Sequence, residues 1–113
     1  MRRWLLSPSQ GNNSFSISDN GWIKLDNGLI IQWGYIKNEI PNIIQSGHAK
    51  TSIVHVNFPI SFPHKVFNVT TTINSSGLGL DRNTDIIING TLTNSGVNIG
   101  ADELGVYWMA IGY

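Results

Sequence analysis

The longest patterned stretch of the chain carries apolar residues on both of its faces. Residues 21–34 read GWIKLDNGLIIQWG, two short strands joined at Asn27-Gly28, since both residues tolerate the positive φ angles of a tight turn. A two-residue turn fixes which residues lie opposite one another. The predicted pairs are Leu25 with Ile30, Ile23 with Gln32 and Trp22 with Trp33. Apolar side chains then lie on both faces of the hairpin, so each face must pack against other apolar residues.

Two more segments alternate between apolar and polar residues, as half-buried strands do. Residues 52–58 alternate, with Val54, Val56 and Phe58 on one side and His55 facing solvent. Residues 66–73 resume the alternation, and the expected inward side chains are Phe67, Val69, Thr71 and Ile73. Between these segments, residues 58–63 read FPISFP, and proline lacks the N–H that a ladder needs. We expect a surface corner there, held by buried Phe58 and Phe62.

The end of the sequence is apolar on both faces. Residues 106–113 read VYWMAIGY, where most chains fray, so we expect a strand docked inside the fold. Residues 74–83 and 94–105 have the composition of flexible loops. Residues 85–93 predict either two short strands around Asn89-Gly90 or one bulged strand. Residues 1–19 predict an extended lead-in or linker, and residues 20–113 the folded domain.

These segments predict an all-β fold, a small antiparallel β-sandwich. Ile, Val and Thr together supply 29 of the 113 residues, whereas Ala supplies 3, the inverse of a helical protein. A small sandwich has one interior, so a second copy of the chain is the expected cover for the two-sided strands. We therefore expect a homo-oligomer.

The composition narrows the choice of partners. Charged residues make up 12% of the chain, while Asn, Ser and Thr number 13, 11 and 7. Seven cations balance seven anions, which argues against nucleic acid and anionic membranes, because both rely on clustered Lys and Arg. There is no Cys, no apolar run of about 18 residues for membrane insertion, and no signal-peptide segment near the start.

Three blocks of the sequence also resemble a known family. They are residues 21–34, then FPISFP with Val66-Phe67 and Val69-Thr70 following, then YWMAIGY at residues 107–113. In this order they resemble the C-terminal domain of bacteriophage or prophage tail fibres, over residues 21–113. One departure is Asp26, where the family often has proline before the turn.

The resemblance implies a trimeric β-structured head, an intertwined homotrimer at the distal end of a fibre. Such a head adsorbs to a bacterial surface glycan, usually lipopolysaccharide, or to an outer-membrane protein. It would be made in the host cytoplasm and carried on the virion, joined to an upstream shaft. A working fibre also needs that shaft and a virion attachment region, so we expect a C-terminal fragment or an exchangeable tip.

Candidate site residues follow from the loops and the two-sided strands. Receptor contacts are expected on connections, because a rigid sandwich presents function there. The candidates are Asn74, Ser75, Asp81, Arg82, Asn83, Asn94, Asn98 and Asp102; the alternative is that they are solvated turns. The residues expected in the trimer interface or core are Trp22, Leu29, Ile31, Trp33, Tyr35, Tyr107, Trp108, Ile111 and Tyr113. For Trp22, Trp33, Tyr107 and Trp108, packing is preferred over a sugar-binding platform.

Catalysis, metals and cofactors have little support. The three histidines are too scattered for a metal site, and the nearby acid pairs occur in flexible stretches with nothing to raise a pKa. We expect no cofactor, no metal and no enzymatic activity. Three functions stay open: a receptor-binding tip, a structural trimerisation cap with the receptor site elsewhere, and a polysaccharide hydrolase.

Overall fold

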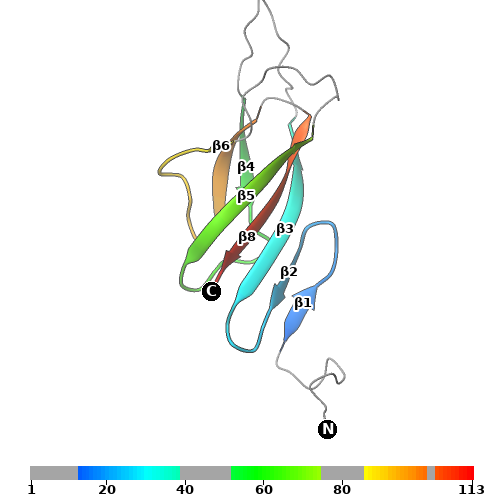
Figure 1. Cartoon of the computed structure of the whole chain (residues 1–113), viewed down its shortest axis with the longest axis vertical. Helices are drawn as coiled ribbons and strands as arrows, with labels where there is room; N and C mark the ends of the chain where they lie inside the picture. The colour runs from blue at the N-terminus through cyan, green and yellow to red at the C-terminus, as the bar shows by residue number, and fades with distance from the viewer. Residues whose placement is uncertain (1–12, 39–51, 75–85, 102–103) are drawn as a thin grey trace, which may run out of the picture.

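The described part of the chain consists of strands joined by turns. The computed structural model describes residues 13–38, 52–74, 86–101 and 104–113 (Figure 1). The strands are β1 (Ser14–Ser16), β2 (Gly21–Lys24), β3 (Ile30–Lys37), β4 (Ser52–Asn57), β5 (Val66–Asn74), β6 (Ile86–Ile87), β7 (Gly96–Ala101) and β8 (Gly105–Gly112). These residues contain no helix, which confirms the all-β class that the excess of Ile, Val and Thr predicts.

Two antiparallel sheets pack around one core. The five-stranded sheet has the order β1-β2-β3-β8-β5, and the three-stranded sheet has the order β4-β7-β6. Buried residues of both sheets form a single cluster with the two corner phenylalanines. Its members are Ile30, Val56, Phe58, Phe62, Val66, Val97, Ile99, Ala101, Val106, Trp108 and Ala110. The sandwich and the buried Phe58 and Phe62 are thus confirmed.

Strand β8 lies in the middle of the five-stranded sheet. It pairs with β3 on one side and with β5 on the other. Val106, Trp108 and Ala110 point into the core, each 5% exposed or less. The prediction of a docked terminal strand is confirmed, and β8 is the strand that joins the two halves of its sheet (Figure 1).

The predicted register of the first hairpin is wrong by one residue. Trp22 lies opposite Gln32, and Ile23 lies opposite Ile31. The loop has three residues, since the Leu25 N–H donates to the Leu29 carbonyl (2.8 Å) around Asp26, Asn27 and Gly28. A residue with positive φ commonly closes such a loop, and Gly28 has a φ of 95°. The shift moves Trp22 to the core-facing side of the sheet.

A bulge corrects the inward set predicted for residues 66–73. The register of β5 against β8 slips between Val66 and Asn68. Val66 and Val69 can therefore both face inward, although they are three residues apart. Phe67 takes the unpaired position and is 55% exposed, not buried as its alternation predicts.

The stretch 94–105, predicted as a flexible loop, contains a strand. Strand β7 is the centre of the three-stranded sheet, and Val97, Ile99 and Ala101 are fully buried. Its glycines masked the alternation in the sequence. Between the two possibilities for residues 85–93, the structure has one short strand, β6, followed by a turn in which the Thr91 N–H donates to the Ile88 carbonyl (3.2 Å).

One amide fastens the proline-rich corner to β3. The Gln32 side chain is 0% exposed. Its Nε2 donates to the Ile60 carbonyl (2.8 Å), and its Oε1 accepts from the Ile60 N–H (3.0 Å). This pair of bonds replaces the strand ladder that the prolines interrupt.

The five-stranded sheet turns a second apolar face away from the core. The pairing places Phe15, Ile23, Ile31, Met109 and Ile111 on this face, and we call them the outer apolar face. Phe15 is 50% exposed and Met109 52%, while the three isoleucines are half-buried. This is the two-sided character that the hairpin sequence predicts.

The two ends of the sandwich differ. The described residues that border the stretches 39–51, 75–85 and 102–103 gather at one end, because Lys37 and Asn74 both lie opposite Gly105. Asn38 Nδ2 also donates to the Ala101 carbonyl there (3.4 Å). Strand β1 begins at the opposite end, beside the 25–29 loop (Figure 1). It lies inside the predicted lead-in 1–19; the boundary at residue 20 stays a prediction.

Candidate functional site

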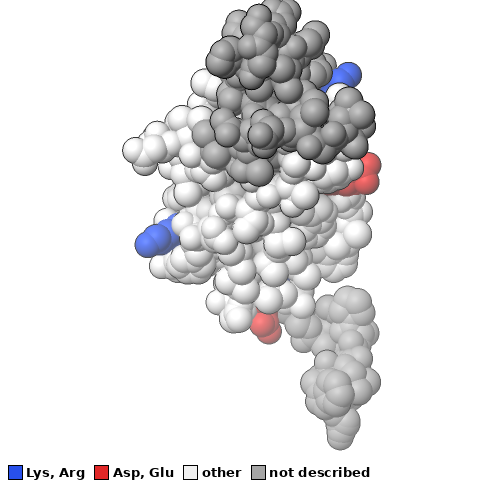
Figure 2. Space-filling model, turned by 45° about the horizontal axis from the view of Figure 1, so that its top comes forward, with Lys and Arg blue, Asp and Glu red and all other residues white. Residues whose placement is uncertain are grey.

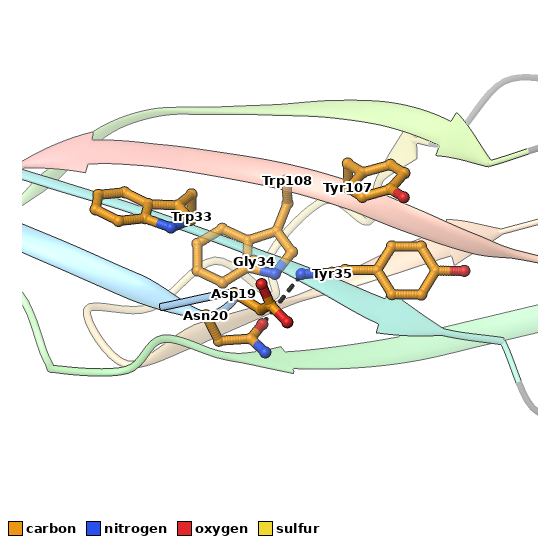
Figure 3. Close-up of a pocket in the computed structure, with 7 residues that line it drawn as sticks. All are labelled: Asp19, Asn20, Trp33, Gly34, Tyr35, Tyr107 and Trp108. Carbon is orange, nitrogen blue, oxygen red and sulfur yellow. Dashed lines mark hydrogen bonds between the residues drawn. The ribbon is translucent and has the colours of Figure 1, made fainter. Parts of the chain in front are cut away.

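A pocket of about 560 Å³ lies along β3 beyond the point where β2 ends. Strand β2 pairs with β3 only as far as Gly21, opposite Trp33. The bend before β2 takes over from there, and Asn20 Oδ1 accepts a hydrogen bond from the Tyr35 N–H (3.0 Å). We call this the aromatic pocket. Its lining residues are Asp19, Asn20, Trp33, Gly34, Tyr35, Tyr107 and Trp108 (Figure 3).

Aromatic rings form most of the pocket, and other residues hold them in place. The rings of Tyr35 and Tyr107 pack with their centroids 4.6 Å apart. Asn74 Nδ2 donates to the Tyr35 hydroxyl (2.9 Å), and Trp33 Nε1 donates to the Ser18 carbonyl (2.9 Å). Because two of the rings are tied by hydrogen bonds, the pocket is shaped before any ligand arrives.

Gly34 leaves the space in which the polar groups of the pocket meet. A Cβ atom at this position would collide with Asn20 Oδ1 and lie 2.8 Å from Trp108 Nε1. Both groups therefore lie on the same side of β3, above the glycine. Figure 3 shows the nitrogen-bearing edge of Trp108 in the middle of the pocket.

The lining of the pocket also includes a buried indole. Trp108 is 5% exposed, and its Nε1 lies beside Gly34, near Asn20 Oδ1. Among the described residues that line the pocket, Asp19 is the one acid, and there is no Lys or Arg. The arrangement can pack against a flat apolar ring and exchange hydrogen bonds with polar groups at its edge.

A second group of rings lies at the other end of the sheet. Tyr113 stacks between His64 and Phe67, with centroid distances of 4.8 Å and 5.4 Å. A shallow hollow beside it is lined by Asn27, Leu29, Lys65, Phe67 and Tyr113. The bulge at Phe67 is what frees this ring for the stack.

The predicted receptor-binding residues do not form one cluster among the described residues. Asn74 lies at the end of β5 and holds Tyr35. Asn94 lies at the opposite end, where its Nδ2 donates to the His64 carbonyl (3.2 Å). Asn98 lies within β7 and hydrogen-bonds to His55. Ser75, Asp81, Arg82, Asn83 and Asp102 lie outside the described residues.

The residues expected in the interface or core divide among four places. Trp108 belongs to the core and also lines the aromatic pocket; Trp22 faces inward, half-buried. Ile31 and Ile111 lie on the outer apolar face. Trp33, Tyr35 and Tyr107 line the aromatic pocket, on the same side of the sheet as Ile31 and Ile111, and Leu29 and Tyr113 line the second hollow.

The described residues include neither a cluster of metal-binding side chains nor a membrane-spanning helix. No group of three or more His, Asp or Glu side chains is placed to hold a metal ion within residues 13–38, 52–74, 86–101 and 104–113. The same residues include no helix with the length and hydropathy needed to cross a bilayer.

A known family profile covers most of the chain. The family is described as "Putative tail fiber protein gp53-like, C-terminal", and it matches residues 24–113. The chain belongs to this family. The tail-fibre resemblance seen in the three sequence blocks is thereby confirmed, and the match of this tail-fibre domain begins at the last residue of β2.

Solved tail fibres share the fold of this tail-fibre domain. An N-truncated R1-type pyocin tail fiber is 26% identical, with a TM-score of 0.66 over 89% of this chain and 85% of that one. The R1 pyocin fiber of P. aeruginosa is 26% identical, with a TM-score of 0.65 over 89% of this chain and 28% of that one. The fold thus occurs within longer fibres.

A relative of similar sequence comes from an archaeon. The uncharacterized protein MJ0347 of Methanocaldococcus jannaschii is 34% identical over 110 residues, which is 84% of this chain. The chain spans 64% of the length of that curated relative.

Asp19 and Asn20 are pocket residues that the sequence analysis did not identify. They stand at the predicted start of the domain, next to a strand, and nothing in their spacing points to a ligand. Their position depends on where β2 stops against β3, which became visible only with the correct register. The sequence singles out Trp22, Trp33, Tyr107 and Trp108 as a group and favours packing over sugar binding for these four.

Proposed function

We propose that this tail-fibre domain is a receptor-binding tip that adsorbs to a bacterial surface receptor without chemical turnover. The receptor would be lipopolysaccharide, another surface polysaccharide or an outer-membrane protein. Membership of the tail-fibre family and the likeness to pyocin tail fibers support this proposal. The domain would lie on the virion, at the distal end of a fibre whose shaft precedes residue 13.

The observation that carries the proposal is the difference between the two ends of the sandwich. The chain reaches β1 at one end, and the ends of β3, β5 and β7 gather at the other. A shaft joined through residues 1–12 would therefore attach opposite the connections that follow β3, β5 and β7. Residues on those connections would face the cell, as binding residues on a rigid scaffold commonly do.

The surface is suited to uncharged partners. On the face that Figure 2 shows, the charged side chains of the described residues are scattered singly among uncharged ones. Amide and hydroxyl groups exchange hydrogen bonds with sugars or with polar protein loops. Each such contact is weak in water, so repetition of the site in an oligomer would supply the affinity.

We further propose that three copies assemble as a homotrimer and bury the outer apolar face. That face points away from the core, and two of its side chains, Phe15 and Met109, are at least half exposed in the single chain. Exposed apolar surface of this kind marks contact with another molecule. Light scattering should give three times the 12.5 kDa mass of the chain.

Adsorption to cells tests the receptor-binding function. The recombinant domain should bind a susceptible strain saturably, and removal of the surface polysaccharide should abolish binding if the receptor is a glycan. The variant with Asp81→Ala, Arg82→Ala and Asn83→Ala should bind more weakly while its mass and circular dichroism stay unchanged. Failure to adsorb to any strain of a broad panel would contradict the proposal.

A structural trimerisation cap is the second candidate, and the outer apolar face favours it. A cap needs this face to join the chains and needs no receptor site. Under this alternative the triple alanine variant would change neither adsorption nor assembly. A hydrolase would instead release reducing sugar from host polysaccharide, which a glycosidase does with a pair of carboxylates. Asp19 is the one acid among the described residues that line the aromatic pocket.

A further inference from the structure

The chain contains three asparagines that are followed directly by glycine, and all three lie within the described residues. The pairs are Asn20-Gly21, Asn27-Gly28 and Asn89-Gly90. Such a pair is chemically labile, because the glycine nitrogen can attack the side-chain amide of the asparagine and no Cβ atom hinders its approach. We infer that the fold protects two of the pairs and leaves Asn89 as a site where the chain modifies itself. The inference does not rest on the proposed function.

The reaction exchanges ammonia for water. The deprotonated Gly90 nitrogen bonds to Asn89 Cγ, and the bond from Cγ to Nδ2 breaks, so that Nδ2 leaves as ammonia with the proton that Gly90 lost. A cyclic succinimide remains, and one water molecule opens it. Opening at one carbonyl gives aspartate; opening at the other gives isoaspartate, in which the backbone runs through the side chain. The rate depends on how freely the two reacting groups can meet.

The first pair is held in the five-stranded sheet. Asn20 Oδ1 accepts a hydrogen bond from the Tyr35 N–H (3.0 Å), and the Asn20 carbonyl accepts one from the Ser18 hydroxyl (2.9 Å). Gly21 is buried and lies opposite Trp33 in the pairing of β2 with β3. The side chain and the glycine nitrogen can therefore react only after this part of the sheet opens.

The second pair is exposed, but both of its reacting groups are hydrogen-bonded. Asn27 Oδ1 accepts from the Leu29 N–H (2.9 Å). The Gly28 N–H, whose proton must be removed, donates to the Leu25 carbonyl (2.9 Å). Because both bonds belong to the 25–29 loop, the pair becomes reactive only when the loop opens.

The third pair lies in the turn that follows β6. Asn89 and Gly90 are both exposed. The bond that closes this turn runs from the Thr91 N–H to the Ile88 carbonyl (3.2 Å), so it joins the two residues that flank the pair. A Cβ atom at Gly90 would meet nothing within 4 Å. The Asn89 side chain therefore has room to turn onto the Gly90 nitrogen without breaking a strand pairing.

Modification at Asn89 would loosen the end of β6. The Ile88 N–H donates to the Asn98 carbonyl in β7 (3.0 Å). Thr91 Oγ1 donates to the Ile88 carbonyl (2.7 Å) and accepts from the Asn98 N–H (3.1 Å). Isoaspartate adds one carbon atom to the backbone between Ile88 and Thr91, so these bonds cannot all keep their geometry. The new carboxylate also adds a negative charge to a chain whose formal net charge is zero.

Peptide mapping by mass spectrometry measures all three sites in one sample. The intact chain is incubated in mildly alkaline buffer, and the conversion of each asparagine is followed with time. Asn89 should react at least about ten-fold faster than Asn20 and Asn27, because those two react only after local opening. In urea that unfolds the chain the three rates should converge, since the hydrogen bonds that protect two of the pairs are then lost.

Paired variants assign the change of charge to Asn89. Asn89→Gln should slow the appearance of the acidic form on ion-exchange chromatography at least about five-fold, because the longer side chain must close a larger ring. Asn27→Gln removes the other exposed pair and should leave the rate unchanged. Both substitutions change exposed side chains, and circular dichroism checks that each variant folds.

Amide hydrogen exchange measures the loosening of β6. The isolated isoaspartate form should exchange the Ile88 N–H faster than the fresh chain does. The control is Asn89→Asp, which carries the new charge without the added backbone atom and should exchange like the fresh chain. The Leu25 N–H, in the hairpin loop, should exchange equally in all three forms.

Several outcomes would overturn the inference. Equal rates at the three sites of the native chain would do so, and so would a difference in rate that persists in urea. An Asn89→Gln variant that becomes acidic as fast as the native chain would place the reaction elsewhere. Unchanged exchange of the Ile88 N–H in the isoaspartate form would contradict the loosening of β6.

Discussion

Gln32 shows how one polar side chain can be required inside an apolar core. The corner at residues 58–63 cannot continue a strand ladder past its prolines, and the Gln32 amide satisfies both backbone groups of Ile60 instead. This role of Gln32 is not predictable from the sequence, because one glutamine on a hairpin face is equally compatible with exposure to solvent.

Gln32→Met tests this role at nearly constant volume. Methionine fills the site but leaves the Ile60 N–H and carbonyl without partners, so the free energy of unfolding should fall by about 2–3 kcal/mol. Urea denaturation at a fixed protein concentration measures the change. The control is Thr72→Val, which removes a polar group from an exposed position of β5 and should change the free energy little. Equal stability of the two variants would show that the corner is held by packing alone.

At the scale of elements, several strands were predictable from alternation, whereas the turn geometry and strand β7 were not. Residues 52–57 and 105–112 formed strands where their apolar patterns placed them. The hairpin register failed because Asp26-Asn27-Gly28 closes a three-residue loop in place of the two-residue one. Strand β7 was missed because Gly96 and Gly100 interrupt its alternation, although its Val97 and Ile99 are fully buried.

The 25–29 loop depends on the backbone freedom of Gly28. Its φ of 95° disfavours residues with a side chain, and open space surrounds the position of its Cβ. Gly28→Ala should therefore lower the free energy of unfolding by about 1–2 kcal/mol through backbone strain alone. Gly28→Asn should cost less, because Asn tolerates this conformation. Thermal or urea unfolding of the two variants makes the comparison, and an equal loss in both would point to a steric cause.

For the candidate site as well, the residue types were predictable from the sequence, whereas their arrangement in space was not. The aromatic residues stood out in the sequence, but their common pocket depends on the end of β2 at Gly21 and on the bend that follows Ser18. The sequence alone shows which side chain each position carries. Which side chains share a cavity depends on pairing partners that are far apart along the chain.

At the scale of the whole molecule, the outer apolar face is the feature that one copy does not hide in its core. Met109→Asp places a charge at the centre of this face, opposite Trp33 in the pairing with β3. In the proposed homotrimer this charge would be buried without a partner, so the variant should dissociate to single chains. Light scattering at matched concentrations follows the mass.

The matched control carries the same charge on the other sheet. Ile53 is 65% exposed on the face of β4 that points away from the core, so Ile53→Asp should leave the oligomer intact. A Met109→Asp variant that keeps the native mass, or equal dissociation of both variants, would show that the outer apolar face is not the contact between copies.

The placement of the strand ends has a consequence for how such a domain can diverge. Lengthening a connection costs little, about 0.6 kcal/mol for each doubling, and the stretches 39–51, 75–85 and 102–103 all leave the sandwich away from β1. Insertions or substitutions in these stretches leave the hydrogen bonds between strands unchanged. They also leave unchanged the β1 end, where the shaft is proposed to attach. Under the proposed function, a particle could acquire a new host by rewriting these stretches while keeping the same scaffold.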